Sequence, residues 1–342
     1  MKALRWLGPV GWPAVAVLLA TIPFLGLSRY YLTLMDQAMI FSIAVLGLYF
    51  VLGMTGQLSL AQAAFFGLGA YTAAILAVNF GFPVWVNIPI GIVVAAVFGV
   101  LLGVPSLKLS GHYLAMTTIG FGVILNLVFR NWKPVTGGTD GIPGIHATTL
   151  AGSSLSHPGL FYYVIFASLV GAAAVAWRVK RSRLGRAFNA IRENELAAEA
   201  AGVDSTRYKV IAFALSAAYG GLAGVLWTHF ARFIAPETFG FDTSVQMLAM
   251  LVIGGSTTVA GSLIGAFILT FLPEVLRFLQ GSYIAVYGAG IILLMVFLPE
   301  GIAGGVRLLA SRWAGSAEDA PRMLSQTADA VGEVRDDVNP SG

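Results

Sequence analysis

The chain of 342 residues contains no cysteine and few charged residues. Without cysteine it can form neither disulfides nor cysteine-ligated metal sites. Charged residues make up 11% of the sequence, against about 25% in a typical soluble domain. No Asp, Glu, Lys or Arg occurs between positions 37 and 107 or between 141 and 177. Such long uncharged stretches exclude an ordinary soluble fold.

Sequence signatures of catalysis and of nucleotide binding are also missing. The chain has no phosphate-binding G-x-x-x-x-G-K-[ST] loop, no nucleophile elbow and no His-Glu metal motif. Its four histidines, His112, His146, His157 and His229, have no ligand-like spacing. The net charge of +4 does not indicate nucleic acid, because the basic residues flank apolar segments as the positive-inside rule describes. We therefore expect neither an enzyme nor a chain with a cofactor of its own.

Apolar runs of membrane-spanning length fill most of the sequence. A span needs about 20 mostly apolar residues. Runs that approach this length lie at 10–27, 38–54, 60–78, 84–104, 113–129, 160–177, 210–231, 244–255, 261–278 and 284–298. They predict an all-α polytopic transmembrane helical bundle with about 8–10 membrane segments, some of them broken or re-entrant. No small-residue cleavage pattern follows the first run, so it is predicted to remain as a span rather than to be removed as a signal peptide.

A charged island at 178–209 interrupts the apolar runs. It carries eight basic and four acidic residues: Arg178, Lys180, Arg181, Arg183, Arg186, Arg192, Arg207, Lys209, Glu193, Glu195, Glu199 and Asp204. Its basic excess predicts a cytoplasmic loop. Counting spans from a cytoplasmic N-terminus then places the loop 131–158 outside the membrane, on the periplasmic side. The predicted transmembrane domain covers 1–311, and the polar segment 312–342 is predicted to be a disordered cytoplasmic tail.

Two apolar–small–apolar hairpins carry most of the uncharged polar residues within the bundle. The runs 38–54 and 60–78 meet through 55–59, and the short run 244–255 meets 261–278 through a Gly-Gly-Ser-Thr-Thr break. Broken backbone at membrane depth is tolerated only where it is buried or lines a cavity. A path for a small polar solute could use the polar residues at and near these breaks: Gln57, Ser59, Gln62, Thr117, Thr118, Ser256, Thr257 and Thr258. The same residues could instead only hydrogen-bond neighbouring helices.

The spans themselves are predicted to lack acids and bases. Asp36 and Glu274 lie near predicted span ends, which disfavours proton coupling because proton relays place ionisable groups inside the bundle. Sodium coupling through carbonyls and hydroxyls stays open. Small residues recur four apart at Gly99/Gly103, Gly220/Gly224 and Gly261/Gly265, a spacing that lets helices approach closely.

Within the island, residues 184–192 alternate basic and apolar side chains at near-helical spacing, and 193–202 form an Ala-rich helix candidate that ends at Gly202. Such a segment could lie on anionic lipid or dock on a cytoplasmic partner. The acids Glu195 and Glu199 favour docking, since they gain nothing from facing anionic headgroups.

Several motifs resemble those of branched-chain amino acid ABC transporter permeases. They are GQLSLAQAAFFGLGAY at 56–71, TGGTDGI at 136–142, AIRENE at 190–195 leading to Ala201-Gly202, VIGG at 252–255 and GSLIGA at 261–266. They occur in the family's order over most of residues 38–300. The TGGTDG loop is similar to the LivM type of permease rather than the LivH type.

This resemblance implies a multi-pass subunit of an ABC importer in the bacterial inner membrane. It implies a second homologous permease, two cytoplasmic ATP-binding subunits that hold ATP-Mg, and an extracytoplasmic solute-binding protein as partners. The Glu199-Ala200-Ala201-Gly202 segment resembles the element by which importer permeases dock on their ATPases. The residues implied in ATPase coupling are Arg192, Glu193, Glu195, Glu199, Ala200 and Gly202.

The substrate implied by the resemblance is Leu, Ile or Val, another amino acid, or urea or a short amide. Two other functions stay open from the residues alone. A stand-alone sodium-coupled secondary carrier would transport without any ATPase, and a membrane scaffold would bind a partner through the 193–202 helix without moving a solute.

Overall fold

The computed structural model describes residues 28–106, 111–145, 149–150, 153–154 and 158–277, with single positions at 21, 23, 109, 288, 301 and 302. All of these belong to one compact unit, Leu19–Ala303. The predicted spans at 10–27 and 284–298 and the predicted tail 312–342 lie outside the continuously described ranges.

The described chain is helical apart from one short antiparallel ladder. In chain order, its elements are α2 (Arg29–Leu48), η3 (Tyr49–Met54), α3 (Gln62–Phe80), α4 (Val84–Ser106), α5 (Gly111–Asn131), α6 (Lys133–Thr136), η4 (Gly138–Asp140), β1 (Thr149–Leu150), β2 (Ser153–Ser154), α7 (Pro158–Arg181), α8 (Arg183–Glu193), α9 (Glu195–Ala200), α10 (Ser205–Ala231), η5 (Pro236–Phe239), α11 (Phe241–Gly254) and α12 (Val259–Val275).

Helices long and apolar enough to cross a membrane confirm the prediction of an all-α polytopic bundle. In the described part of the chain they number six: Arg29–Met54, Gln62–Phe80, Val84–Pro105, Gly111–Asn131, Leu160–Arg181 and Ser205–Ala231. The apolar helices α11 and α12 are shorter, as expected for the segments predicted to be broken or re-entrant.

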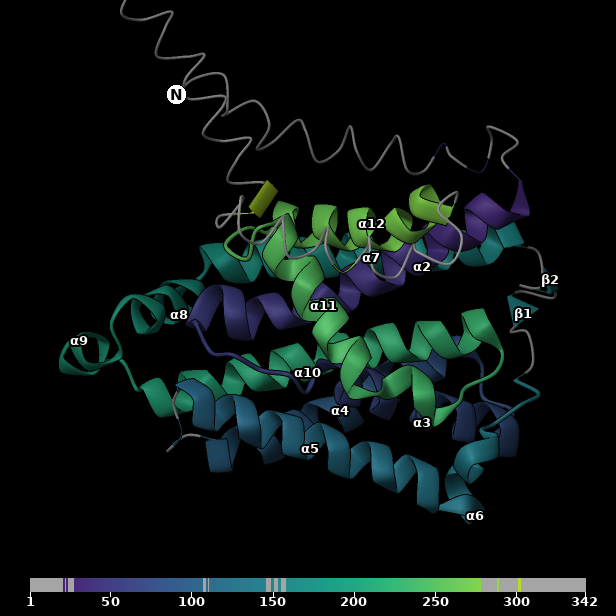
Figure 1. Cartoon of the computed structure of the whole chain (residues 1–342), viewed down its shortest axis with the longest axis horizontal. Coiled ribbons are helices and arrows are strands. Elements are labelled where there is room, and N and C mark those ends of the chain that lie inside the picture. The colour runs from purple at the N-terminus through teal and green to yellow at the C-terminus, as the bar shows by residue number, and fades with distance from the viewer. Residues whose placement is uncertain are drawn as a thin grey trace, which may run out of the picture. The chain divides into compact units, whose positions relative to one another are not determined.

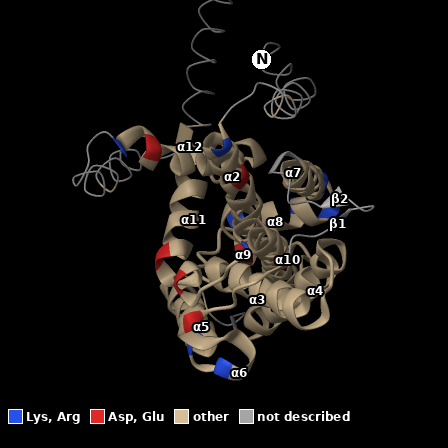
Figure 2. Cartoon of the chain, turned by 90° about the vertical axis from the view of Figure 1, so that its right-hand side faces the viewer, with Lys and Arg blue, Asp and Glu red and all other residues tan. Residues whose placement is uncertain are grey.

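The helices form two groups that meet where α2 packs on α10 and that α11 also bridges. Figure 2, a view along the helices, shows α2, α7 and α12 in one group and α3, α4, α5 and α10 in the other. Helix α10 packs along α3, α4 and α2, and α2 also packs against α7 and α12. In the most apolar part of the span Arg29–Met54, 89% of the residues are buried. In the most apolar part of each of α4, α5 and α7, the buried share is 28%. The core therefore lies around α2 and α10, while α4, α5 and α7 present apolar faces outward.

Glycines bring the central helices into backbone contact. A Cβ on Gly224 of α10 would lie 2.7 Å from the Ala70 nitrogen and 3.0 Å from the Phe66 carbonyl carbon, both in α3. A Cβ on Gly261 of α12 would lie 2.6 Å from the Gly254 carbonyl oxygen of α11. These approaches confirm that the small residues four apart serve helix packing.

The two predicted hairpins differ in the structure. Helices α11 and α12 pack closely, whereas α2 and α3 touch each other at few points. The difference arises from the linker between η3 and α3. Residues 55–61 form no hairpin turn after η3, and α3 packs mainly on α10 and α4 instead.

Two helix limits differ from the sequence prediction. The helices expected within 178–209 are present as α8 and α9, but the flanking spans also extend into this segment, because α7 continues to Arg181 and α10 begins at Ser205. Helix α2 begins at Arg29, nine residues before the apolar run that predicted it. Charged residues mark where a helix leaves the apolar layer, and the hydrogen-bonded helix itself can continue beyond that point.

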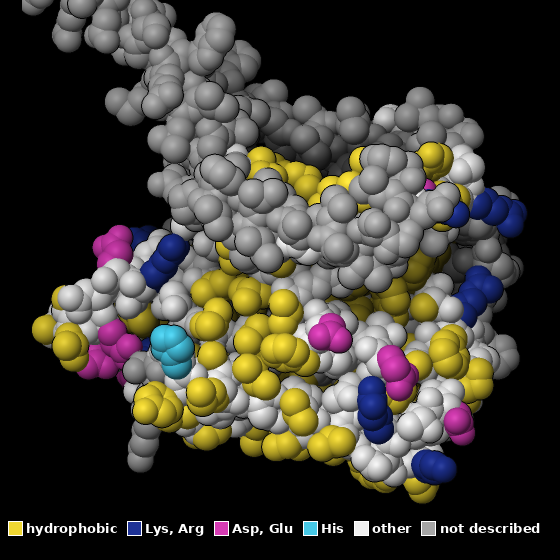
Figure 3. Space-filling model, viewed as in Figure 1, with side chains coloured by type: hydrophobic (Ala, Val, Ile, Leu, Met, Phe, Trp, Pro, Cys, Tyr) yellow, Lys and Arg dark blue, Asp and Glu magenta, His cyan; other side chains and the backbone are white. Residues whose placement is uncertain are grey.

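The charged side chains of the island gather at one end of the bundle. Figure 1 shows α8 and α9 at the left end, opposite α6 and the β1–β2 ladder. On the face seen in Figure 3, acidic and basic side chains surround α8 and α9 while hydrophobic side chains cover much of the middle. We call this end, with α8 and α9, the docking end, after the role that the sequence analysis predicts for it.

Candidate functional site

Helix α8 is anchored to the bundle by its apolar side. The Ser182 hydroxyl caps its start by accepting a hydrogen bond from the Gly185 N–H, at 3.4 Å. Phe188 is fully buried and Ile191 is nearly so, and the Phe188 ring meets Tyr208 of α10 edge-on at 6.2 Å. The alternating pattern at 184–192 thus forms an amphipathic helix, and its apolar face covers its own bundle.

Helix α9 is a short projection with a cap at each end. Asn194 Oδ1 accepts from the Ala197 N–H at 3.1 Å. At the other end, the Gly202 N–H donates to the Glu199 carbonyl and the Val203 N–H to the Ala198 carbonyl, both at 2.9 Å. This pair of bonds is a Schellman motif, which needs a left-handed residue, and Gly202 has φ +85°. The predicted glycine stop is therefore where the structure ends the helix.

The acids of α9 turn toward their own chain. Glu195 pairs with Lys209 at 2.5 Å, and the Lys209 side chain is only 6% exposed. The Ser205 hydroxyl donates a hydrogen bond to the Glu199 carboxylate. These contacts hold α9 against the first turns of α10. Both acids therefore fix the position of α9, in addition to any contact that they make with a partner. Glu193 and Ala200 are exposed.

The most exposed apolar side chain at the docking end is one that the sequence analysis did not select. Leu196 is 78% exposed on α9, between the two acids that tie the helix down. An exposed leucine in an otherwise polar projection was the available signal. The sequence analysis instead selected the acids of this segment, because it relied on charge.

Arg192 reaches from α8 into the bundle. Its Nη1 donates to the Gly53 carbonyl of η3 at 2.6 Å. Two residues after the π-helix η3, Gly56 has φ +72°, and a Cβ there would lie 3.2 Å from Arg192 Cγ. From the end of α7, Lys180 Nζ donates to the Thr257 carbonyl in the α11–α12 turn at 3.1 Å. Both helix breaks are thus bonded to cations of the island.

Three of the residues predicted to line a path make structural hydrogen bonds: between helices, to a linker, or at a helix cap. Gln62 Nε2 donates to the Ala44 carbonyl at 2.7 Å, and its Oε1 accepts from the Ser216 hydroxyl at 2.8 Å. Thr118 Oγ1 accepts from the Leu60 N–H at 3.0 Å. Thr258 Oγ1 caps α12 by accepting from the Gly261 N–H at 2.9 Å. These contacts match the alternative in which such residues bond neighbouring segments.

The other five path candidates lie in varied surroundings. Gln57 is buried, and its Oε1 has no hydrogen-bond partner. The remaining four are Ser59, buried; Ser256, half-buried; Thr257, exposed; and Thr117, half-buried. Gln57 therefore has the unmet hydrogen-bonding capacity that a passing polar solute could use.

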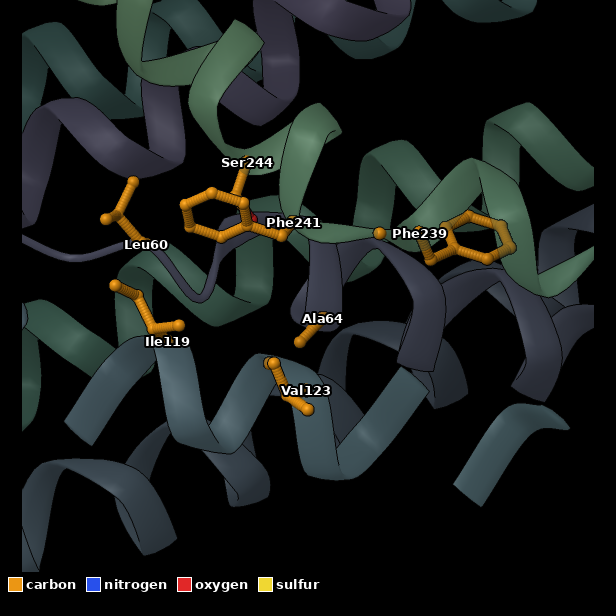
Figure 4. Close-up of a pocket in the computed structure, with 9 residues that line it drawn as sticks. Leu60, Ala64, Ile119, Val123, Phe239, Phe241 and Ser244 are labelled. Atoms are coloured by element: carbon orange, nitrogen blue, oxygen red, sulfur yellow. The ribbon is translucent and has the colours of Figure 1, made fainter. Parts of the chain in front are cut away.

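Two pockets of the described bundle lie away from these candidates. One, shown in Figure 4, lies between α3, α5 and the start of α11 and has a volume of about 10 Å³, room for about one water molecule. Leu60, Ile119, Val123 and Phe241 line it with others. A second, of about 260 Å³, lies between α2, α11 and α12 and is lined by Tyr30, Gln37, Glu274 and others.

Two ionisable residues lie inside spans, which corrects the prediction that the spans lack them. Asp36 is 6% exposed in α2, and its Oδ1 has no hydrogen-bond partner. His229 is 7% exposed in α10, with its Nε2 3.1 Å from Asn87 Nδ2. For Asp36 the prediction failed because α2 starts before its apolar run, which puts this residue two turns inside the helix. His229 already lay within the predicted run 210–231 and was overlooked there. No cluster of three or more His, Asp or Glu that could hold a metal occurs among the residues described.

Long apolar helices in backbone contact, with a charged projection anchored at one end, define a multi-pass membrane protein. Residues 30–299 match the family model described as branched-chain amino acid transport system / permease component. The chain therefore belongs to this permease family. It is a family of transport subunits of ABC importers rather than of enzymes.

Relatives within the curated proteins agree on transport and differ in solute. The chain is 35% identical over 312 residues to the high-affinity branched-chain amino acid transport system permease protein LivM of Escherichia coli K12, covering 84% of this chain and 73% of that protein. It is 26% identical over 288 residues to the ribose import permease RbsC of Haemophilus influenzae, covering 81% and 86%. It is 27% identical over 307 residues to the autoinducer 2 import permease LsrC of Yersinia pestis Pestoides F, covering 84% of each. No solved structure matches the chain significantly.

Proposed function

We propose that this chain is the membrane permease through which an ABC importer moves branched-chain amino acids into a bacterial cell. Its position would be the inner membrane. An extracytoplasmic solute-binding protein would deliver the substrate, a second homologous permease would complete the membrane part, and two cytoplasmic subunits would bind ATP-Mg. The higher identity to the LivM protein than to the ribose and autoinducer 2 permeases supports an amino acid over a sugar.

The orientation of the proposed permease follows from charge. Helix α7 ends with Arg178, Lys180 and Arg181 in its last turn, and basic residues concentrate on the cytoplasmic side of membrane proteins. The docking end would therefore face the cytoplasm. The segment 131–158, at the opposite end, would face the binding protein.

The α9 projection is the observation that carries the proposal. It is capped at both ends, tied to α10 by Glu195 and Glu199, and leaves Leu196 open to solvent. A preorganised helix with one large exposed apolar side chain suits insertion into a groove of a partner, because little conformational entropy is then lost on binding. In the proposed complex the ATPase supplies that groove.

Affinity purification of the tagged chain after gentle solubilisation tests the proposal. We expect two ATP-binding subunits and a second permease to co-purify. Proteoliposomes with the complete complex should take up labelled leucine only with ATP and the binding protein. A chain that purifies alone and moves solute on a sodium gradient would instead be a secondary carrier. Uptake of labelled urea in place of leucine would keep the importer and overturn the substrate.

Leu196 gives a sharper test of docking. We expect Leu196→Asp to weaken ATPase co-purification by about tenfold or more, since buried apolar anchors contribute about 2 kcal/mol or more to binding. Leu196→Met keeps an apolar side chain and should retain the ATPases. Asn189→Asp adds the same charge at an exposed position of α8 and should also retain them. Full ATPase recovery with Leu196→Asp would remove this residue from the interface.

A further inference from the structure

The two helix breaks of the bundle meet each other near the docking end. A Cβ on Gly53 would collide with the Ser256 carbonyl oxygen, so η3 packs directly on the turn between α11 and α12. On the other side of that turn, a Cβ on Gly301 would lie 2.5 Å from Gly255. The breaks are thus one connected structure, although about 200 residues separate them along the chain.

Each break exposes a carbonyl to a cation from the island. At the first break, the Gly56 N–H donates to Leu52 and the Gln57 N–H to Val51. Neither amide serves the Gly53 carbonyl, which accepts from Arg192 at 2.6 Å. At the second break, the Thr257 carbonyl accepts from Lys180 at 3.1 Å. Helix ends leave such carbonyls without intrahelical donors, and a charged donor makes a stronger bond than a neutral one.

The two cations belong to one continuous unit. Lys180 lies in the last turn of α7 and Arg192 in the last turn of α8, while α9 follows two residues after Arg192. The buried side chains of Phe188 and Ile191 fix α8, which lies between the two cations in sequence, on the bundle. A displacement of α8 would therefore act on the Gly53 carbonyl through Arg192, and on the Thr257 carbonyl through the adjoining end of α7, which carries Lys180.

We propose that Arg192 and Lys180 are positioning residues that transmit movement of the docking end to the two helix breaks. Arg192 then acts on the bundle rather than on the ATPase surface, and the η3 turn and the α11–α12 turn change conformation together. Gln57 follows the first break directly, so its unpartnered oxygen would be repositioned by the same movement. This role rests on the proposed function, in which α9 docks on an ATPase.

The test measures coupling in the complete reconstituted transporter. Arg192→Met keeps an unbranched apolar stem and removes the donor, and Lys180→Met does the same at the second break. We expect both variants to assemble with the ATPases and to hydrolyse ATP. Solute moved per ATP hydrolysed should fall by about tenfold, which lies within the range of typical coupling between sites. Arg192→Lys, which keeps a charged donor, should recover part of the loss.

Arg186→Met is the matched control. Arg186 lies on the same helix, and its Nη1 bonds only locally, to the Arg181 carbonyl at 3.5 Å. Its removal should leave the coupling ratio at the wild-type value. An unchanged ratio in Arg192→Met and Lys180→Met would overturn the proposal, as would loss of ATPase binding in Arg192→Met with transport per bound complex intact. Failure of the wild-type chain to bind any ATPase would instead refute the proposed function itself.

Discussion

Single polar residues near the breaks fall into two groups according to whether their hydrogen bonds are satisfied. Gln62 bonds Ala44 and Ser216 through both ends of its amide, and so links α3 to α2 and α10. Gln57 is also buried, but its Oε1 has no partner. Buried polar groups without partners are costly and persist most often where function needs them.

The two glutamines should respond oppositely to the same substitution. We expect Gln62→Leu to lower the free energy of unfolding by roughly 1–3 kcal/mol, because it leaves the Ala44 and Ser216 groups unpaired. Gln57→Leu removes an unsatisfied group, so stability should stay the same or rise while uptake falls. Thermal unfolding in detergent and uptake in proteoliposomes measure the two effects. Normal uptake by Gln57→Leu would remove Gln57 from the path.

Helices meet through glycine in the centre of the bundle. Gly220, Gly221 and Gly224 of α10 each face backbone or Cβ atoms of α3 or α4. Lipid provides no hydrophobic drive for helices to associate, so close packing of their backbones has to stabilise the association instead. Helix α10 can thus contact α2, α3 and α4 at once, and the whole arrangement depends on it.

Replacement of one glycine in this contact should separate the helices. We expect Gly224→Ala to destabilise the protein by about 1–3 kcal/mol through overpacking against α3. Gly120→Ala is the matched control, since a Cβ there meets nothing within 4 Å. Because alanine favours a helix over glycine, the control should be neutral or stabilising by up to about 1 kcal/mol. Equal melting temperatures for the two variants would contradict the packing.

For the molecule as a whole, the absence of cysteine makes the proposed orientation directly measurable. Single cysteines at Asn189 and Val135, both exposed and at opposite ends of the bundle, provide the probes. In intact spheroplasts, a membrane-impermeant maleimide should label Val135→Cys at once. Asn189→Cys should react only after permeabilisation, because basic ends stay in the cytoplasm. The reverse pattern would place the docking end outside and rule out ATPase docking there.

Local pattern was enough to predict much of this protein. Uncharged runs of span length predict helices because no other structure satisfies backbone groups in a bilayer except a closed barrel. The glycine that ends α9 and the glycines of the helix contacts could also be identified, since their roles depend on backbone geometry close to each residue. The family motifs at 56–71 and 252–266 likewise lie at the two helix breaks.

Contacts between distant segments were decided only by the tertiary structure. Nothing near Arg192 in the sequence indicates that it bonds Gly53, 139 residues away, and the family resemblance implied a role in ATPase coupling instead. Lys209 is buried because Glu195 folds back to pair with it. The amide of Gln62 bonds Ala44 of α2, earlier in the chain, and Ser216 of α10, much later in the chain. Residue type and spacing determine which helices form, whereas the partner of each polar group depends on which helices become neighbours.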